Sequence, residues 1–395
     1  MALIGAAIGS LFSGIISDKI GRKPVILIAD VLFTIGAAMM AFAPTISFLM
    51  VGRVVIGLGV GAAAQIVPLY LAEVAPVEIR GKLIAMNTAL ITGGQVFSVI
   101  LVFIIKPDWR VMLGLAGVPS TIQFIGMLFM PESPRWLGKV ERTEKMKVIV
   151  KKIYKESHKD YAIQTIEEEV ENLKAETRMT EMERLRSLFT TYRPCLIIGC
   201  SMQAFQQLIG INTAMYYGPD ILKEAGITFP GLDDDTSALL LNIPLASINA
   251  IGTLISVFII DRLGRRYILL RTLPFVILGW VVVATGMGIA GNPDNKSTGG
   301  MISFVGLIIF LLFFSIGVSS TVNAEIYPIH VIGTASSLST TTNWATNAVV
   351  ASVFLLTTST VVGQVITYSI LALFGLLCLI FVYFKVPETA NKEIN

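Results

Sequence analysis

The side chains in this sequence that are best suited to hold a small molecule are amides inside long apolar segments. Gln203, Gln206, Gln207 and Asn212 fall within ten residues. Helical spacing places the three glutamines on one side of a helix. An amide donates and accepts hydrogen bonds without carrying a charge, so this cluster predicts a site for an uncharged ligand with several hydroxyl groups.

Further candidate amides inside apolar segments are Gln95, Asn249, Asn343 and Asn347. The last two are four residues apart, which puts both on one face of a helix. For a single amide the alternative is a hydrogen bond between helices, and such bonds average about 0.6 kcal/mol in one measured membrane protein. No cationic or anionic set accompanies the amides, which argues against phosphorylated or amino-acid substrates.

The elements that must position these amides are membrane-spanning helices. Of the 395 residues, 54% are hydrophobic and 14% are charged, whereas soluble proteins have about 25% charged residues. Runs of about twenty apolar residues can cross the hydrocarbon core as helices. The sequence predicts eleven such runs, at 2–17, 25–43, 47–72, 83–105, 110–131, 195–223, 237–260, 267–290, 301–324, 335–359 and 363–385. An all-α membrane protein follows, and a soluble enzyme is excluded.

The segment 132–194 divides the chain into two transmembrane parts. It is rich in Lys and Glu, with apolar residues at helical spacing, so it predicts short amphipathic helices at the membrane surface. An N-terminal half, 1–131, precedes it, and a C-terminal half with a short tail, 195–395, follows it. The chain shows no catalytic motif, no cysteine spacing typical of metal ligands, no cofactor motif and no basic stripe for nucleic acid.

Three short polar signatures occur twice, in the same order. The stretch 18–23 (DKIGRK) recurs at 261–266 as DRLGRR, 72–76 (AEVAP) at 324–328 as AEIYP, and 131–133 (PES) at 387–389 as PET. The offsets are 243, 252 and 256 residues. A duplicated, membrane-spanning chain is typical of a secondary transporter with its substrate between two halves.

The duplication also predicts one more helix. Two spans of the second half precede Asp261, whereas one span precedes Asp18. We therefore expect a twelve-helix design whose first helix is missing, either through truncation or because the gene start lies upstream. The alternatives are that eleven spans are the native number, or that the chain is a non-functional fragment.

Lys and Arg residues in the loops predict the orientation in the membrane. Outside the segment 132–193, eleven of them lie on the side of the signatures and four on the other side. The signature loops and the C-terminus are therefore expected in the cytoplasm, with the plasma membrane as the expected location.

Charged residues at helix ends predict a cytoplasmic gate. Pairing of arginines with glutamates there would latch the two halves together, and the alternative is that the positive charges only fix orientation. Gly21 and Gly264 would allow the tight turns between helices. The candidate gate residues are Arg22, Arg80 and Arg265 with Glu73, Glu132, Glu325 and Glu388.

Arg53 is a cation inside an apolar run. If unpaired, it costs about 2.5–3.5 kcal/mol on insertion scales, so a carboxylate partner is expected. Asp30 is a candidate only if its helix reaches Arg53, and the alternative is a residue on the missing helix.

These features resemble the sugar porter family of the major facilitator superfamily over nearly the whole chain. The motifs that carry the resemblance are 131–136 (PESPRW), 206–212 (QQLIGIN), 261–266 (DRLGRR) and 343–344 (NW). The resemblance implies a major facilitator fold of two pseudo-repeated six-helix halves, with eleven of twelve helices present, which moves a sugar or polyol by alternating access. It also implies that the sugar-contacting positions are Gln95, Gln206, Gln207, Asn212, Asn249, Asn343 and Asn347.

The resemblance gives Arg53 a role in coupling, because it matches an arginine that pairs with a first-helix aspartate in proton-coupled members. The stretches 91–95, 212–217 and 321–325 resemble the proton-coupled myo-inositol transporters more than the glucose facilitators. This favours myo-inositol over a glucose-like hexose, while proton symport and facilitated diffusion both stay open. The expected partners are thus the solute, the lipid bilayer and, in symport, protons.

One stretch departs from the family pattern. At 317–321 the sequence reads GVSST, where the family usually has Gly-Pro-x-Pro-Trp, so the proline-dependent gate cannot be carried over. The alternative function is a sugar sensor that binds without transporting. Sensors of this fold usually need a long cytoplasmic tail, and only about ten residues follow the last predicted span.

Overall fold

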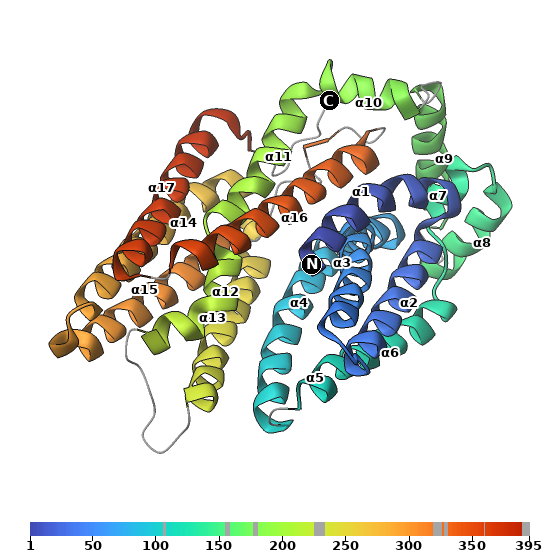
Figure 1. The fold of residues 1–395 in the computed structure, drawn as a ribbon. Helices are drawn as coiled ribbons and strands as arrows, with labels where there is room; N and C mark the ends of the chain where they lie inside the picture. Colours follow the sequence, from blue (N-terminus) through green and yellow to red (C-terminus); the bar gives the residue numbers. More distant parts are fainter. Residues whose placement is uncertain are drawn as a thin grey trace. The chain divides into compact units, whose positions relative to one another are not determined.

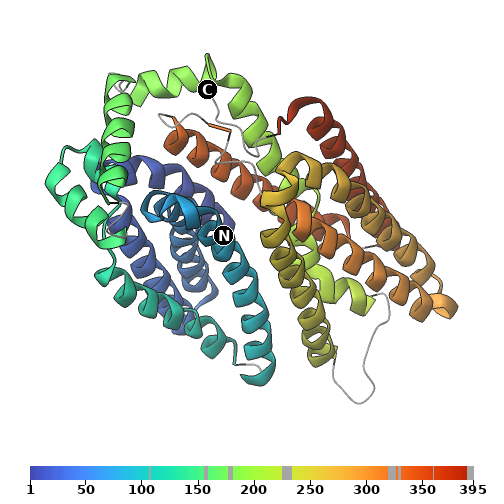
Figure 2. The ribbon, with the colours of Figure 1, turned by 180° about the vertical axis from the view of Figure 1, so that it is seen from behind.

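The computed structural model describes residues 1–105, 108–154, 159–176, 181–224, 234–318, 326–327, 331–358 and 360–388. Helices make up nearly all of these residues, and no strand occurs among them (Figures 1 and 2). The first group is α1 (Ala2–Ile20), α2 (Arg22–Ala41), α3 (Ile46–Val74), α4 (Val77–Ile105), α5 (Trp109–Leu115) and α6 (Gly117–Phe129). Four short helices follow: α7 (Pro134–Lys139), α8 (Thr143–Ile153), α9 (Lys159–Glu176) and α10 (Glu181–Phe189).

The C-terminal group contains the remaining long helices. They are α11 (Arg193–Leu208), α12 (Ile211–Glu224), α13 (Asp234–Leu263), α14 (Arg265–Ala290), α15 (Lys296–Gly317), α16 (Ile332–Thr357) and α17 (Val361–Lys385), with the 3-10 turn η2 (Pro293–Asn295) between α14 and α15. The predicted all-α membrane architecture is confirmed.

Ten segments of the described chain are long and apolar enough to cross a membrane. Two of them consist of two helices in succession, α5 with α6 and α11 with α12. The remaining predicted span, 335–359, corresponds to α16, which has 26 residues. Its hydropathy is lower because Ser, Thr and Asn side chains crowd its first half.

The chain forms two compact units, and α4, α11 and α16 each contribute to both. Unit 1 comprises Met1–Asn87, Asp108–Cys200 and Ile326–Ala345. Unit 2 comprises Thr88–Pro107, Ser201–Glu325 and Thr346–Asn395.

Unit 1 is built around α3, against which both α1 and α2 pack. Small residues allow this close approach, as is common between membrane helices. A Cβ atom on Gly61 would overlap the Ala6 carbonyl of α1, and one on Gly59 would lie 3.0 Å from the Ala29 carbonyl of α2.

The first turns of α16 also belong to unit 1 and contact α1 and α3. The hydroxyls of Ser10 and Thr341 lie 3.1 Å apart. The Gln65 amide lies 2.9 Å from the Thr340 hydroxyl and is 5% exposed. Helices from the first and second sequence repeats are therefore joined here by neutral hydrogen bonds.

Unit 2 is organised around α14, which packs on α15 and α17. Gly279 of α14 lies against Phe310 of α15, with no space for a Cβ atom between them. Trp280, which is fully buried, contacts Phe310 and stacks on Tyr368 of α17. This aromatic cluster fixes α14 beside the break between α11 and α12.

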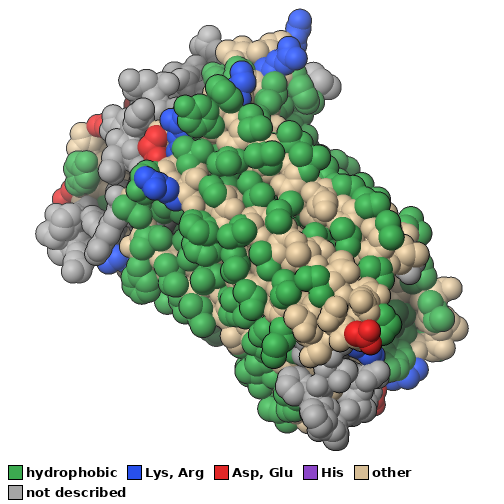
Figure 3. All heavy atoms as spheres, turned by 90° about the vertical axis from the view of Figure 1, so that its left-hand side faces the viewer, with side chains coloured by type: hydrophobic (Ala, Val, Ile, Leu, Met, Phe, Trp, Pro, Cys, Tyr) green, Lys and Arg blue, Asp and Glu red, His purple; other side chains and the backbone are tan. Residues whose placement is uncertain are grey.

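The outer surface is strongly apolar. Figure 3 shows hydrophobic side chains over most of one face, with charged side chains towards its ends. Many large hydrophobic residues of α17 are exposed, including Val362, Ile366, Leu373 and Phe384. Such a surface suits contact with lipid tails.

The segment between the transmembrane parts folds as short helices, as predicted. The buried side chains of Trp136, Leu137, Met146, Val150, Ala162 and Ile166 form its core. The Trp136 Nε1 group also donates a hydrogen bond to the Asp18 carbonyl at 3.0 Å. This bond ties α7 to the end of α1, next to the first signature.

Candidate functional site

A break in the helix after Leu208 shapes the amide cluster. Gly210 has φ of 94°, a left-handed conformation that glycine adopts without steric cost. The break removes the helical partner of the Ile209 carbonyl, and the indole Nε1 of Trp280 donates to it at 2.6 Å. The sequence therefore ends α11 at one side of the break and starts α12 at the other.

Two predicted amides meet across this break. The Asn212 Nδ2 group donates to Gln207 Oε1 at 2.7 Å. Gln207 and Gln203 are 6% and 7% exposed, and Gln206 is half-buried. Thr213, beside Asn212, is buried, and its hydroxyl has no hydrogen-bond partner.

A second network joins α4, α13 and α15. Asn249 lies near the middle of α13, where its Nδ2 group donates to Gln95 Oε1 at 3.1 Å. Its Oδ1 accepts a hydrogen bond from the Ser315 hydroxyl of α15. The structure thus brings Gln95 and Asn249 together, as a network of neutral groups inside apolar helices.

The pair on α16 is buried. Asn343 is 9% exposed and Asn347 is fully buried. Neither polar atom of the Asn347 amide has a hydrogen-bond partner among the residues that the structure describes. Tyr217, in contrast, stacks on Phe354 with ring centroids 4.6 Å apart, so its role is packing.

The first signature turn is closed by a glutamate from a distant part of the chain. Gly21 has φ of 105°, and a Cβ atom there would overlap the Glu132 carboxylate. Glu132 Oε1 accepts hydrogen bonds from the backbone N–H groups of Arg22 and Lys23, at 3.1 and 3.2 Å. A carboxylate at a helix N-terminus satisfies free N–H groups and complements the helix dipole. Glu132 therefore caps α2 instead of pairing with an arginine side chain.

Arg22 forms the predicted ion pair with Glu73. Its Nε and Nη2 atoms donate to the two carboxylate oxygens at 2.9 and 3.0 Å, the bidentate geometry that suits guanidinium and carboxylate. Arg22 Nη1 also donates to Asp18 Oδ1 at 3.0 Å. All three residues belong to the first predicted half, so this cluster joins helix ends within one half.

The second signature turn repeats the first capping arrangement. Gly264 has φ of 86°, and a Cβ atom there would lie 2.7 Å from Glu388 Oε2. The Arg265 backbone N–H donates to Glu388 Oε1 at 3.0 Å. Of the other gate candidates, Glu325 and the Arg80 side chain lie outside the described residues.

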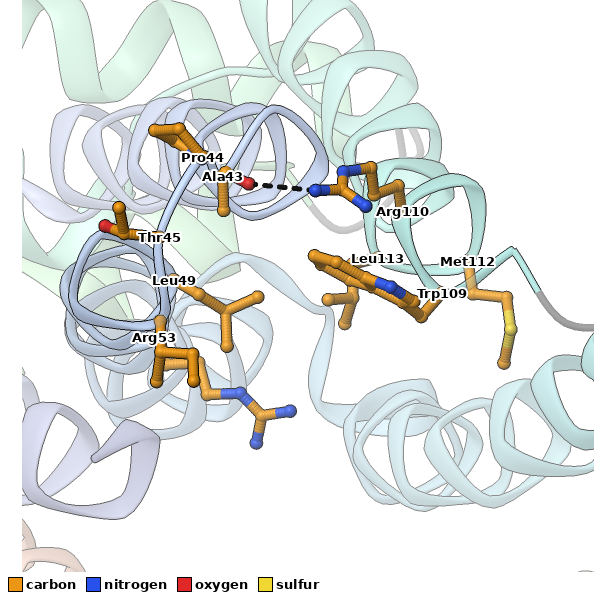
Figure 4. Close-up of a pocket in the computed structure, with 10 residues that line it drawn as sticks. Ala43, Pro44, Thr45, Leu49, Arg53, Trp109, Arg110, Met112 and Leu113 are labelled. Atoms are coloured by element: carbon orange, nitrogen blue, oxygen red, sulfur yellow. Dashed lines mark hydrogen bonds between the residues drawn. The ribbon is translucent and has the colours of Figure 1, made fainter.

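The Arg53 side chain lines a cavity in unit 1 and takes part in no ion pair between described residues. The cavity measures about 550 Å³ and is lined by residues 43–46 and by residues of α3 and α5 (Figure 4). Arg110 Nη2 donates to the Ala43 carbonyl at 3.2 Å, and its guanidinium lies over the Trp109 ring. No carboxylate lines this cavity, and none of the ion pairs between described residues includes Arg53 or Asp30.

Two residues that position the amides were not predicted. Ser315 is a small polar residue within an apolar run, and this position is the feature of the sequence that could have indicated its role. Trp280 is buried in an apolar helix, and a buried indole N–H usually finds an acceptor. Its acceptor, the Ile209 carbonyl, becomes free only through the break at Gly210.

The whole chain matches known transporters. Residues 1–395 match the family model described as "Sugar (and other) transporter". The probable inositol transporter 2 of Arabidopsis thaliana is 34% identical, over 100% of this chain and 82% of that protein. The proton myo-inositol cotransporter of Homo sapiens is 32% identical, over 99% of this chain and 73% of that protein.

The fold also matches a solved structure. XylE, a proton:xylose symporter of the major facilitator superfamily solved with 6-bromo-6-deoxy-D-glucose bound, superposes with a TM-score of 0.78 at 27% identity. The match covers 100% of this chain and 86% of that chain. These relatives are membrane transporters and not enzymes. The chain therefore belongs to the sugar transporter family of the major facilitator superfamily, as a multi-pass membrane protein.

Proposed function

We propose that this protein moves a neutral polyol across the membrane by alternating access, with myo-inositol preferred over a glucose-like hexose. The proposed binding residues are Gln95, Gln206, Gln207, Asn212, Asn249, Asn343 and Asn347. Proton symport is the proposed coupling mode, with Arg53 as a coupling residue. The signature turns face the cytoplasm, with the plasma membrane as the proposed location.

The observation that carries the proposal is the neutral chemistry of a set of polar groups on α4, α12, α13, α15 and α16 in unit 2. The network of Gln95, Asn249 and Ser315 contains amides and a hydroxyl but no charged side chain. Among the residues that the structure describes, the Thr213 hydroxyl, the Asn242 Oδ1 atom and the Asn347 amide have no hydrogen-bond partner. An unsatisfied polar group in an apolar surrounding costs about 1–3 kcal/mol, and the hydroxyl groups of a polyol would remove that cost.

The relatives support the substrate and the coupling mode. The names of the Arabidopsis, human and yeast proteins that are about one-third identical refer to inositol or myo-inositol. The human protein and XylE are named as proton-coupled. These names support the proposed preference for myo-inositol and the proposed proton coupling, whereas the neutral side chains support an uncharged substrate.

The gate proposal rests on the caps and the ion pair at the helix ends. We propose that Arg22, Glu73 and Glu132 at the first signature, and Arg265 and Glu388 at the second, hold the helix ends together in one state of the cycle. Arg80 and Glu325 are proposed as further members of this gate. Separation of the helices would break these bonds, so their number sets the stability of the closed state.

Uptake in cells that lack their own carriers tests the proposal. Cells expressing the protein are supplied with radiolabelled myo-inositol or glucose, with and without an inward proton gradient. We expect saturable myo-inositol uptake that exceeds glucose uptake and that falls when the gradient is dissipated. Equal or greater glucose uptake would overturn the substrate preference, and gradient-independent uptake would overturn symport.

Variants then separate the site from general stability. Gln207→Ala removes the partner of Asn212 and should raise the KM for myo-inositol by about 5–150-fold, the equivalent of about 1–3 kcal/mol. Gln123→Ala is the matched control, because Gln123 is an exposed amide of α6. An unchanged KM in Gln207→Ala at normal surface expression would remove Gln207 from the site.

A further inference from the structure

Asp30 is a carboxyl group buried in the middle of a membrane helix. It lies eight residues after Arg22, roughly 12 Å along α2 at 1.5 Å per residue. The residue is 1% exposed, and its Oδ2 atom has no hydrogen-bond partner among the described residues. An ionisable residue inside a membrane segment is a functional candidate by default, because its burial is costly.

The helices around α2 provide no charge for Asp30. α2 packs on α3, α6, α5 and α1, and α6 has no titratable residue. The charged and titratable residues of the others are Asp18 and Lys19 on α1, Arg22 and Lys23 on α2, Arg53, Tyr70 and Glu73 on α3, and Arg110 on α5. Among the described residues, none of these groups forms a hydrogen bond or an ion pair with the Asp30 carboxyl.

Most of these groups are already engaged at the two ends of α2. Arg22 binds Asp18 and Glu73, the Tyr70 hydroxyl donates to the Pro131 carbonyl at 2.7 Å, and Lys23 caps the end of α6. Arg53 is twenty residues before Glu73 on α3, roughly 30 Å along the helix. Because Glu73 is bound to Arg22, Arg53 lies beyond the level of Asp30.

The closest polar groups along α2 are hydroxyls. Thr34, one turn after Asp30, donates to the Asp30 backbone carbonyl at 2.9 Å. Its hydroxyl also lies 2.8 Å from that of Ser120 on α6. Neither hydroxyl compensates a negative charge on Asp30, so this surrounding favours the neutral carboxylic acid.

We propose that Asp30 is an intramembrane proton-binding site. The carboxyl holds a proton while α2, α3 and α6 are packed as in this structure, and it releases that proton when the transport cycle admits water to this contact. This proposal deepens the proposed proton symport and rests on it. It assigns the bound proton to a residue of α2, separate from the amide groups that would hold the substrate.

Proteoliposomes containing Asp30→Asn test the assignment. Asparagine resembles the neutral acid in shape, so the variant should fold and exchange labelled for unlabelled myo-inositol at close to the normal rate. Accumulation driven by an inward proton gradient should fall at least tenfold. Asp294→Asn is the matched control, because Asp294 is an exposed carboxyl in η2, and it should accumulate normally.

A second readout separates this proposal from the transport proposal. Infrared difference spectra of the purified protein during a pH titration should contain a protonated-carboxyl band that is lost in Asp30→Asn and kept in Asp294→Asn. If the wild-type protein fails to transport myo-inositol but this band is lost only in Asp30→Asn, the proton site stands and the proposed function fails. Gradient-driven accumulation and a carboxyl band that both survive in Asp30→Asn would overturn the proton site.

Discussion

The charged cluster of unit 1 and the amide network of unit 2 solve the same problem in different ways. Each satisfies polar groups between apolar helices. Arg22, Glu73 and Asp18 do so with ionic groups at helix ends, whereas Gln95, Asn249 and Ser315 do so with neutral groups, Asn249 near the middle of its helix. The cost of burying a charge without a partner explains this distribution.

This difference between the charged cluster and the amide network indicates that the two have different roles. In the charged cluster, the Arg22 and Glu73 side chains bind each other in a bidentate ion pair. The cluster therefore has little capacity to bind a ligand. In the described part of unit 2, Thr213, Asn242 and Asn347 carry buried polar atoms without hydrogen-bond partners. The charged cluster is therefore suited to stabilise a conformation, and the neutral groups are suited to bind and release an uncharged solute.

The largest expected effect comes from Arg22→Ala. The substitution leaves Glu73, whose side chain is 10% exposed, without its ion-pair partner, and breaking a buried pair costs about 3–5 kcal/mol. The midpoint of thermal unfolding in detergent should fall clearly. Lys19→Ala, at an exposed position of the same turn, should change stability by less than about 0.5 kcal/mol. Equal midpoints in the two variants would contradict a structural role for the Arg22 cluster.

The next largest loss of stability is expected from substitutions of the turn glycines, with similar losses in both repeats. Gly21→Ala and Gly264→Ala each place a Cβ atom against a capping glutamate at positive φ, and strained backbone of this kind costs about 1–3 kcal/mol. Thermal unfolding of the two variants should show similar losses. A loss in one variant alone would show that the two turns are not equivalent.

Asn249→Leu should affect ligand binding more than stability. It removes hydrogen bonds to both Gln95 and Ser315, and the expected loss of about 1–3 kcal/mol corresponds to about 5–150-fold weaker myo-inositol binding. Equilibrium binding to the purified protein measures the change. If the unfolding midpoint falls as far as in Arg22→Ala while affinity is unchanged, Asn249 is structural.

Ser315→Ala should give the smallest effect. It removes one contact of Asn249 but keeps Gln95 in place, and an interhelical hydrogen bond of this type is worth about 0.6 kcal/mol. Affinity for myo-inositol should fall by less than about threefold in the same binding assay. A loss as large as that of Asn249→Leu would indicate that Ser315 itself contacts the ligand.

The sequence was sufficient to predict the family, the helical membrane fold and the approximate positions of the long helices, but not the breaks within 110–131 and 195–223. Apolar runs and repeated signatures are local patterns, and the helix positions depend mainly on them. The residue types indicated that arginines and glutamates pair at the helix ends, but not that Arg22 pairs with Glu73. The capping roles of Glu132 and Glu388 did not follow from the residue types either, because a carboxylate can bind either a guanidinium or the backbone N–H groups of a helix.

The contacts that cross between distant helices were beyond sequence reasoning. Nothing in the spacing of Asn249 indicates Ser315 as its partner, since 66 residues separate them. The sequence pattern also did not indicate that α16 belongs to both units, with Asn343 in unit 1 and Asn347 in unit 2. Such relations depend on how helices pack and not on the pattern within any one helix.

Equilibrium binding of radiolabelled myo-inositol to the purified protein, with neutral and charged competitors, tests most directly whether the buried site is neutral. We expect saturable binding that unlabelled myo-inositol displaces and that myo-inositol monophosphate does not, because the groups of unit 2 identified above provide no cation for a phosphate. Displacement by the phosphorylated compound at equal concentration, or the absence of saturable binding, would contradict a neutral polyol site in this protein.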